Sequence, residues 1–214
     1  MTGRSPSRRF AAVVALTAWF ALALQYVLII VSPGDGIGPL LATFRYVAFF
    51  TIISNVMVAL TATFAVLPGS SSVAALFRSA RLRGCTALCI GITLAIYHSI
   101  LAATWDPQGA QWLADVTLHY AVPLLYLAWW FLFAPHGELG WFDAVRWLLF
   151  PAVYVTCVLL RGAWLHEYPY PFIDVDALGA AAVARNAVGV GLLFLVVGLA
   201  LVALDRWRAR SVRA

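Results

Sequence analysis

Lysine is absent from the 214-residue sequence, and charged side chains of all kinds make up only 11% of it. Soluble domains carry about a quarter charged residues, so this composition excludes an ordinary soluble domain. The missing lysine also excludes a retinal protein, because that class binds its chromophore through a lysine Schiff base. The 14 strongly basic side chains are therefore all arginines. With abundant alanine, valine and glycine, this is typical of a GC-rich genome and favours a bacterial source.

Cysteine is also scarce, with three residues that all lie in apolar segments and form no Cys-x-x-Cys pair. We interpret Cys85, Cys89 and Cys157 as small buried side chains rather than as metal ligands or a redox pair. The function that we favour below uses no metal and no cofactor. Most of the arginines lie in the tails and short loops and form no patch that would bind nucleic acid.

Long apolar runs recur along the whole chain, which is 64% hydrophobic. Six runs are long enough to cross a membrane as helices, since one crossing needs about 20 apolar residues. They predict an all-α, polytopic membrane protein with a single six-helix domain over residues 1–214, folded as one bundle. The predicted helices lie near residues 10–31, 44–67, 84–104, 112–134, 141–164 and 178–204.

Basic and acidic residues alternate between the predicted connections. The N-terminal tail, the loop after the second helix and the C-terminal tail carry three, three and four arginines. The first, third and fifth loops carry acidic residues instead. Cytoplasmic segments of membrane proteins are enriched in basic residues, so we expect a multi-pass protein of the cell membrane with both termini in the cytoplasm.

Three polar residues share one face of the second predicted helix, within the apolar stretch YVAFFTIISNVMVAL. Thr51, Ser54 and Asn55 stand at positions i, i+3 and i+4 of a helix. At 1.5 Å per residue, Thr51 lies about 10 Å below the outer surface, and His119 of the fourth helix lies at about the same depth. Alternate helices run in opposite directions, so this agreement in depth indicates a shared polar layer.

Other predicted helices bring ionisable groups to the same layer. His98 lies about 9 Å and Arg185 roughly 10 Å below the outer surface, and Arg161 is near the outer end of the fifth helix. Ionisable groups are costly in lipid and normally face a bundle interior or a wet cavity. The sequence therefore predicts a polar pocket that faces the outer leaflet and is surrounded by membrane lipids.

A hydroxyl and an imidazole at one depth are the nucleophile and the base of covalent acyl transfer. Asp115 precedes His119 by four residues and is placed to orient its ring, as the acid of a triad does. Ser54 competes with Thr51 as the nucleophile. The remaining roles go to groups that would bind an oxyanion or a substrate carboxylate. They are Asn55, Tyr120 and Tyr126 for the oxyanion, and Arg161 and Arg185 for the carboxylate.

Three short motifs, FTIISN, LHYAVP and YPYPF, resemble those of the androgen-induced-gene family of multispanning membrane proteins. That family includes the androgen-dependent TFPI-regulating protein and bacterial six-helix relatives. Its animal members hydrolyse fatty acid esters of hydroxy fatty acids with an intramembrane threonine nucleophile and a histidine base. The resemblance implies that Thr51 is the nucleophile and His119 the base, and Asn55 and Asp174 look like part of the bacterial pattern.

The YPYPF stretch, Tyr168 to Phe172, resembles the extracytoplasmic YPF segment of the same family. Its two prolines fix φ and prevent regular hydrogen bonding, so the stretch is stiff. Tyrosine and phenylalanine suit the membrane–water boundary. We expect Tyr168 and Tyr170 to contact substrate as part of a lid, or to serve only as an interfacial anchor.

The predicted function is an intramembrane hydrolase whose substrate is a small amphiphilic ester. Three alternatives remain open. In a zinc hydrolase, His98 and His119 would bind the metal with His166 or Asp115. In a haem protein, His98 and His119 would be the axial ligands. In a transporter or lipid-binding protein the polar layer would bind without catalysis, although transporters often use broken helices and the sequence shows no obvious break.

Overall fold

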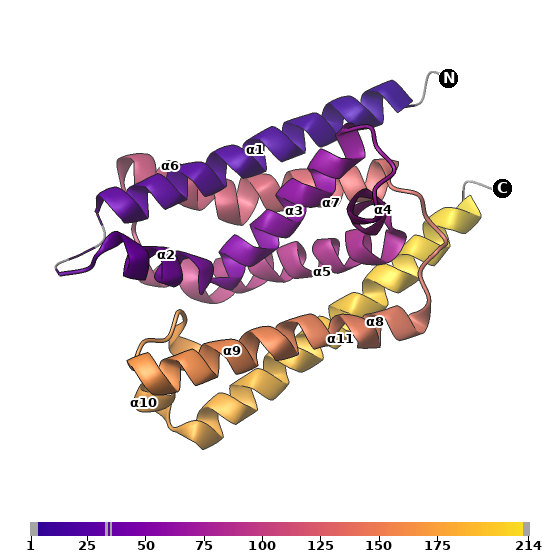
Figure 1. The fold of residues 1–214 in the computed structure, drawn as a ribbon. Helices are drawn as coiled ribbons and strands as arrows, with labels where there is room; N and C mark the ends of the chain where they lie inside the picture. The colour runs from indigo at the N-terminus through magenta and orange to yellow at the C-terminus, as the bar shows by residue number, and fades with distance from the viewer. Residues whose placement is uncertain (1–3, 33, 35, 212–214) are drawn as a thin grey trace. The chain divides into compact units, whose positions relative to one another are not determined.

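The computed structural model describes residues 4–32, 34 and 36–211 (Figure 1). Every regular element among these residues is a helix, which confirms the all-α prediction. Five helices are long and apolar enough to cross a membrane, or six if one sharply bent pair counts as a single crossing. The chain forms two compact units, Met1–Pro135 and His136–Ala214, and the single six-helix domain stays a prediction. The division falls at the connection that contains Pro135 and Gly137, where regular helix ends.

The first unit holds three helical segments of membrane-crossing length, or four if the bent pair counts as one. Its elements in chain order are α1 (Arg4–Val31), α2 (Pro39–Val47), α3 (Phe50–Val66), α4 (Ser72–Arg78), α5 (Ala80–Ile96), the π-helical turn η1 (Tyr97–Leu101), the 3-10 turn η2 (Ala102–Thr104), α6 (Gly109–Val116), the π-helical turn η3 (Thr117–Ala121) and α7 (Val122–Phe133). Helix α1 packs along α3, α6 and α7, and α5 packs against α3 and α7 (Figure 1). These contacts bring α3, η1 and η3 together.

The second predicted crossing, residues 44–67, is not one continuous helix. It is divided between α2 and α3, which are bent by 75° at Ala48 and Phe49. The amides of Ala48 and Phe49 close α2 in a tight turn by donating to the carbonyls of Arg45 and Tyr46. Phe49 is then extended, with φ −80° and ψ 129°. The prediction of a single helix over this range is wrong.

Contacts between α2 and α1 account for the break, since neither glycine nor proline stands there. The Tyr46 hydroxyl donates to the Leu22 carbonyl at 2.8 Å, and the hydroxyls of Thr43 and Tyr26 are 3.1 Å apart. These bonds fix α2 to α1 and override the local preference for a continuous helix. As a consequence, Thr51 is the second residue of α3.

The predicted helices 84–104 and 112–134 are also interrupted, each by a π-helical turn. In η3 the amide of Val122 donates to the carbonyl of Thr117, five residues earlier, and η1 closes with an equivalent bond. Pro123 gives the reason for η3. A proline has no N–H and its ring clashes with the carbonyl four residues before it, here that of His119. The wider π turn relieves this clash and places His119 inside it.

The second unit contains two long helical segments and the loop between them. Its elements are α8 (Trp141–Trp147), α9 (Leu149–Leu165), the 3-10 turn η4 (Pro171–Ile173), α10 (Val175–Leu178) and α11 (Ala180–Ser211). The step between α8 and α9 falls at Leu148, because Pro151 has no N–H for the Trp147 carbonyl. The predicted helix 178–204 instead begins after Gly179, whose φ of +79° turns the chain, and extends to Ser211.

A buried carboxylate on α11 fastens the connection that precedes α8. Asp205 is 1% exposed, and the Nδ1–H of His136 donates to it at 3.0 Å. The backbone N–H groups of Gly137 and Leu139 donate to its other oxygen at 2.9 and 3.1 Å. A buried carboxylate with three donors is well satisfied, so Asp205 has a structural role within this unit.

Candidate functional site

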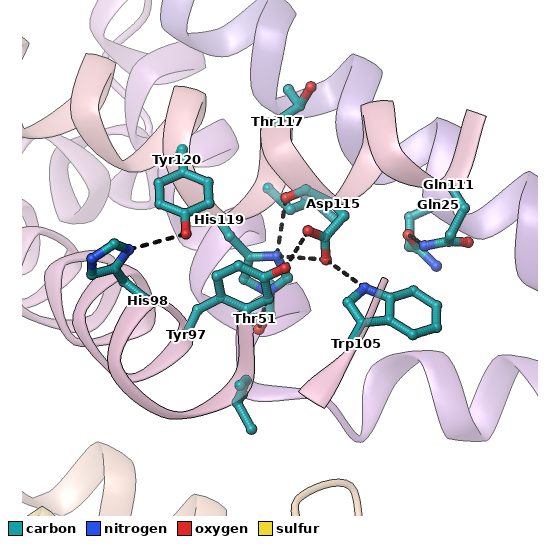
Figure 2. A network of polar contacts seen from close by, with 12 residues as sticks. Gln25, Thr51, Tyr97, His98, Trp105, Gln111, Asp115, Thr117, His119 and Tyr120 are labelled. Atoms are coloured by element: carbon teal, nitrogen blue, oxygen red, sulfur yellow. Dashed lines mark hydrogen bonds and ion pairs between the residues drawn. The ribbon is translucent and has the colours of Figure 1, made fainter. Parts of the chain in front are cut away.

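The Thr51 hydroxyl and the His119 ring meet inside the first unit. His119 Nε2 lies 3.2 Å from Thr51 Oγ1, which is hydrogen-bonding distance. Thr51 comes from the start of α3 and His119 from η3 (Figure 2). Thr51 is 8% exposed, and the His119 side chain is 13% exposed. A hydroxyl and a base are thus paired in a nearly enclosed place.

The partners of Nδ1 fix the proton of the His119 ring. Nδ1 lies 3.0 Å from the Asp115 carbonyl oxygen and 3.2 Å from the Asp115 carboxylate. Both groups accept hydrogen bonds and neither donates, so Nδ1 carries the proton. Nε2 then presents its lone pair to the Thr51 hydroxyl. This is the tautomer that a general base requires.

The Asp115 carboxylate is bound by two further side chains. The Tyr97 hydroxyl donates to its Oδ2, and the Trp105 indole N–H donates to its Oδ1 at 3.1 Å. Tyr97 belongs to η1, whereas Trp105 follows η2 in an outer loop by the predicted orientation. Three donors from three segments therefore hold one buried carboxylate, as Figure 2 shows.

An aromatic stack covers the His119 ring. The ring centroids of Tyr97 and His119 are 3.7 Å apart, and the ring planes differ by 10°. Tyr97 also meets the ring of Tyr120 edge-on at 5.6 Å. The Tyr120 hydroxyl is 3.2 Å from His98 Nδ1, so His98 joins the cluster through Tyr120 (Figure 2).

Ser54 and Asn55 support Thr51 from the next turn of α3. The Ser54 hydroxyl bonds the Thr51 carbonyl at 3.1 Å and the Thr93 hydroxyl at 2.9 Å. The Asn55 amide donates to the carbonyls of Thr51 and Leu118, at 2.8 and 3.2 Å. Both side chains are fully buried. Of the two candidate nucleophiles, Thr51 is therefore the one that meets an imidazole, while Ser54 bonds α5.

The candidate oxyanion donors are occupied in other ways. The Asn55 amide and the Tyr120 hydroxyl have the partners given above, and the Tyr126 hydroxyl donates to the Arg83 carbonyl at 3.1 Å. Tyr126 stands about two helical turns from His119 along α7. The start of α3 offers another source of positive potential at Thr51, because the N-terminal end of a helix dipole is positive.

The other predicted site residues belong to the second unit and make local contacts there. Arg161 pairs with the Glu167 carboxylate at 3.0 Å, so its charge is already matched within the protein. The Tyr168 ring packs on Gly162, and the Tyr170 ring stacks on Phe172. Arg185 is exposed on α11 rather than enclosed, because it is the neighbouring Asn186 that turns inward to bond the Phe172 carbonyl.

Metal ligands do not gather in the described part of the chain. Among residues 4–32, 34 and 36–211, no three His, Cys, Asp or Glu side chains are close enough to hold an ion. His98 instead bonds Tyr120, and His166 bonds Asp176 at 2.8 Å. The zinc alternative therefore has no ligand cluster in this part of the chain.

Sequence reasoning missed Tyr97 and Trp105. Tyr97 directly precedes His98 in the stretch AIYHSIL, and Trp105 begins the loop WDPQ. An aromatic residue beside a membrane histidine, and a tryptophan ten residues before a buried carboxylate, were the available signals. Neither signal shows which atom the side chain will bind.

Comparison of the chain with protein families, with curated proteins and with solved structures finds no match. The resemblance to the androgen-induced-gene family therefore stays a prediction, and the function is argued from the geometry around Thr51.

Proposed function

We propose that the protein is an intramembrane hydrolase of lipid carboxylic esters, with Thr51 as the nucleophile and His119 as the base. The observation that carries this proposal is the 3.2 Å contact between Thr51 Oγ1 and the unprotonated Nε2 of His119. The Asp115 carboxylate, 3.2 Å from Nδ1, would stabilise the imidazolium that forms when the hydroxyl loses its proton. A threonine hydroxyl is a weak nucleophile at neutral pH and needs such a base.

The reaction has two steps, acylation of Thr51 and hydrolysis of the acyl-threonine. Thr51 Oγ1 attacks the ester carbonyl carbon while its proton moves to Nε2, and Nε2 then returns that proton to the departing alcohol. Water attacks the resulting acyl-threonine and gives a proton to Nε2, which returns that proton to Thr51 Oγ1 as the free acid leaves. The positive end of the α3 dipole lies at Thr51, where it favours the negative charge of each tetrahedral intermediate.

The surroundings of Thr51 support an amphiphilic substrate. The Thr51 hydroxyl lies at the start of the apolar helix α3, and the Asp115 carboxylate near it is held by Tyr97 and Trp105. A lipid ester brings its polar carbonyl to such a site while its chains remain in the membrane. The resemblance to the androgen-induced-gene family suggests fatty acid esters of hydroxy fatty acids as the class to test first.

A panel of lipid esters tests the proposal in purified protein. We expect Thr51→Ala and His119→Ala each to lower kcat by at least about 10³-fold, and the double variant to lose little more, because the two residues act as one unit. Thr51→Ser should keep part of the activity, since it keeps the hydroxyl. Thr156→Ala is the matched control, because the Thr156 hydroxyl is exposed on α9 and donates to the Ala152 carbonyl of its own helix.

An acylating or phosphonylating probe gives a second readout, since the expected adduct on Thr51 can be located by mass spectrometry. A well-folded Thr51→Ala variant that hydrolyses esters at the wild-type rate would remove Thr51 as the nucleophile. Ser54 would then be the next residue to replace.

The break between α2 and α3 favours a second candidate function. Transporters often bind substrate where a membrane helix is interrupted, and α2 and α3 are bent by 75° two residues before Thr51. The sequence argument against a transporter, the lack of an obvious break, is therefore wrong. Tight binding of an ester without turnover, and without any probe adduct, would favour this function over hydrolysis.

A further inference from the structure

Tyr97 contacts Asp115 and His119, the two residues that assist Thr51 in the proposed reaction. Its hydroxyl donates to Asp115 Oδ2, and its ring stacks on His119 at 3.7 Å. We propose that Tyr97 is a positioning residue, which fixes the carboxylate with its hydroxyl and the imidazole with its ring, so that Nε2 stays directed at Thr51. The inference rests on the proposed function, because it assigns Tyr97 a part in the same reaction.

The imidazole needs a restraint that hydrogen bonds at Nδ1 do not supply. Bonds to the Asp115 carbonyl and carboxylate lie at one edge of the His119 ring. They leave the ring able to tilt about that edge, which would move Nε2 away from Thr51. A face-to-face contact with ring planes 10° apart opposes this tilt, because the Tyr97 ring occupies the space into which the imidazole would move.

The carboxylate needs a restraint as well, because a turn of its plane would carry the oxygen away from His119. Tyr97 holds Oδ2, while Trp105 and His119 share Oδ1. A turn of the plane would strain all three bonds together, so one oxygen stays directed at His119. Hydrogen bonds to an ionised group are stronger than neutral ones, which gives this arrangement its stiffness.

Both rings of the stack come from π-helical turns. Tyr97 is the first residue of η1 and His119 is the third residue of η3. Such turns are frequent at functional sites, and Pro123 accounts for the one that holds His119.

Two substitutions distinguish the role of the Tyr97 hydroxyl from that of the Tyr97 ring. Tyr97→Phe keeps the ring and loses the hydrogen bond to Asp115, and we expect kcat to fall about tenfold. Tyr97→Leu loses both contacts, and we expect kcat to fall about a hundredfold, as for a reacting group displaced by about 1 Å. KM should stay within about twofold in both variants, because the residue acts through His119 and Asp115 rather than on substrate.

Thr86→Ala is the matched control. It removes a fully buried hydroxyl from the same unit, one that donates to the Leu82 carbonyl at 2.8 Å instead of to Asp115. Its stability should fall while its kcat does not change. A Tyr97→Leu variant with wild-type kcat, or one that raises KM alone, would overturn the positioning role.

Nuclear magnetic resonance of ¹⁵N-histidine-labelled protein in nanodiscs gives a readout that needs no turnover, with His119→Gln to assign the signal. We expect a single Nδ1-protonated ring for His119 in the wild type and in Tyr97→Phe, and a broadened or split signal in Tyr97→Leu. An unchanged signal in Tyr97→Leu would contradict the inference. If the wild type hydrolyses no ester but the signals behave as expected, the proposed function fails while the positioning of His119 stands.

Discussion

Asp115 contributes two separate acceptors to one nitrogen of His119. Its backbone carbonyl and its carboxylate lie 3.0 and 3.2 Å from Nδ1. In the serine-protease triad only the carboxylate holds this proton, and replacing the acid by its amide puts the histidine into the wrong tautomer. Here the main-chain carbonyl would keep the tautomer after such a change. The side chain would then supply only the charge that stabilises the imidazolium.

One prediction follows from these separate roles of the Asp115 carbonyl and carboxylate. Asp115→Asn should lower kcat by about 10²-fold, which is the loss expected when one charged hydrogen bond of about 3 kcal/mol is removed. That loss is clearly smaller than the roughly 10⁴-fold seen when a triad loses its tautomer. Ester hydrolysis by Asp115→Asn and His119→Ala, measured side by side, tests the prediction. Equal losses in the two variants would show that the carbonyl does not hold the ring.

For single residues, the sequence predicts where a side chain lies along its helix better than it predicts which atoms that side chain contacts. Depth along the helices placed Thr51 beside His119, and the four-residue spacing placed Asp115 beside the same ring, although the roles of these residues stay predictions. The stacking of Tyr97 and the reach of Trp105 depend on side-chain torsions and on two π turns. Those features arise from packing between segments, which spacing along the chain does not record.

At the scale of elements, the irregular turns differ in how much the sequence says about them. Pro123 and Pro151 mark η3 and the step at Leu148, because a proline cannot donate to the carbonyl four residues earlier. The break between α2 and α3 has no such mark. It depends on the hydrogen bonds that join Thr43 and Tyr46 to α1, so a local pattern predicts a continuous helix there.

A glycine in α9 gives the prediction at this scale. A Cβ on Gly162 would lie 2.0 Å from the Tyr168 ring, far inside van der Waals contact. We expect Gly162→Ala to displace Tyr168 and to destabilise the protein by about 1–3 kcal/mol, the usual cost of overpacking. Thermal unfolding in detergent, followed by tryptophan fluorescence, measures this cost as a lower midpoint.

Gly189→Ala on α11 is the control for that variant. A Cβ on Gly189 would meet nothing within 4 Å, and alanine favours a helix interior over glycine by about 0.5–1 kcal/mol. The control should therefore unfold at the same temperature as the wild type or slightly above it. If both variants unfold together with the wild type, the close packing of Tyr168 on Gly162 is not present in solution.

At the scale of the whole molecule, the bent pair decides how many times the chain crosses the membrane. Helix α3 has 17 residues and is about 25 Å long, which nearly matches the apolar thickness of a bilayer without help from α2. The nine residues of α2 include exposed Leu40 and Phe44, which suit the membrane boundary. Six crossings with both termini in the cytoplasm remain our expectation for this chain.

Reporter insertions test that topology. A phosphatase-type reporter that folds only outside the cytoplasm should be active when placed in the loop 105–108 and inactive when placed in the loop 67–71. A fluorescent protein fused after residue 214 should show the opposite preference and fluoresce. Activity of the phosphatase at both loops would mean that the segment between them does not cross, and the orientation would have to be redrawn.

The buried carboxylate of Asp205 has a consequence for the order in which the protein is made. Its donors, His136 and the backbone amides of Gly137 and Leu139, precede it by 66 to 69 residues. A ribosome delivers those donors several seconds before their acceptor, at about 5–20 residues per second. The connection before α8 therefore reaches its final form only after residue 205 has been synthesised, and a chain released before that residue lacks the acceptor for all three donors.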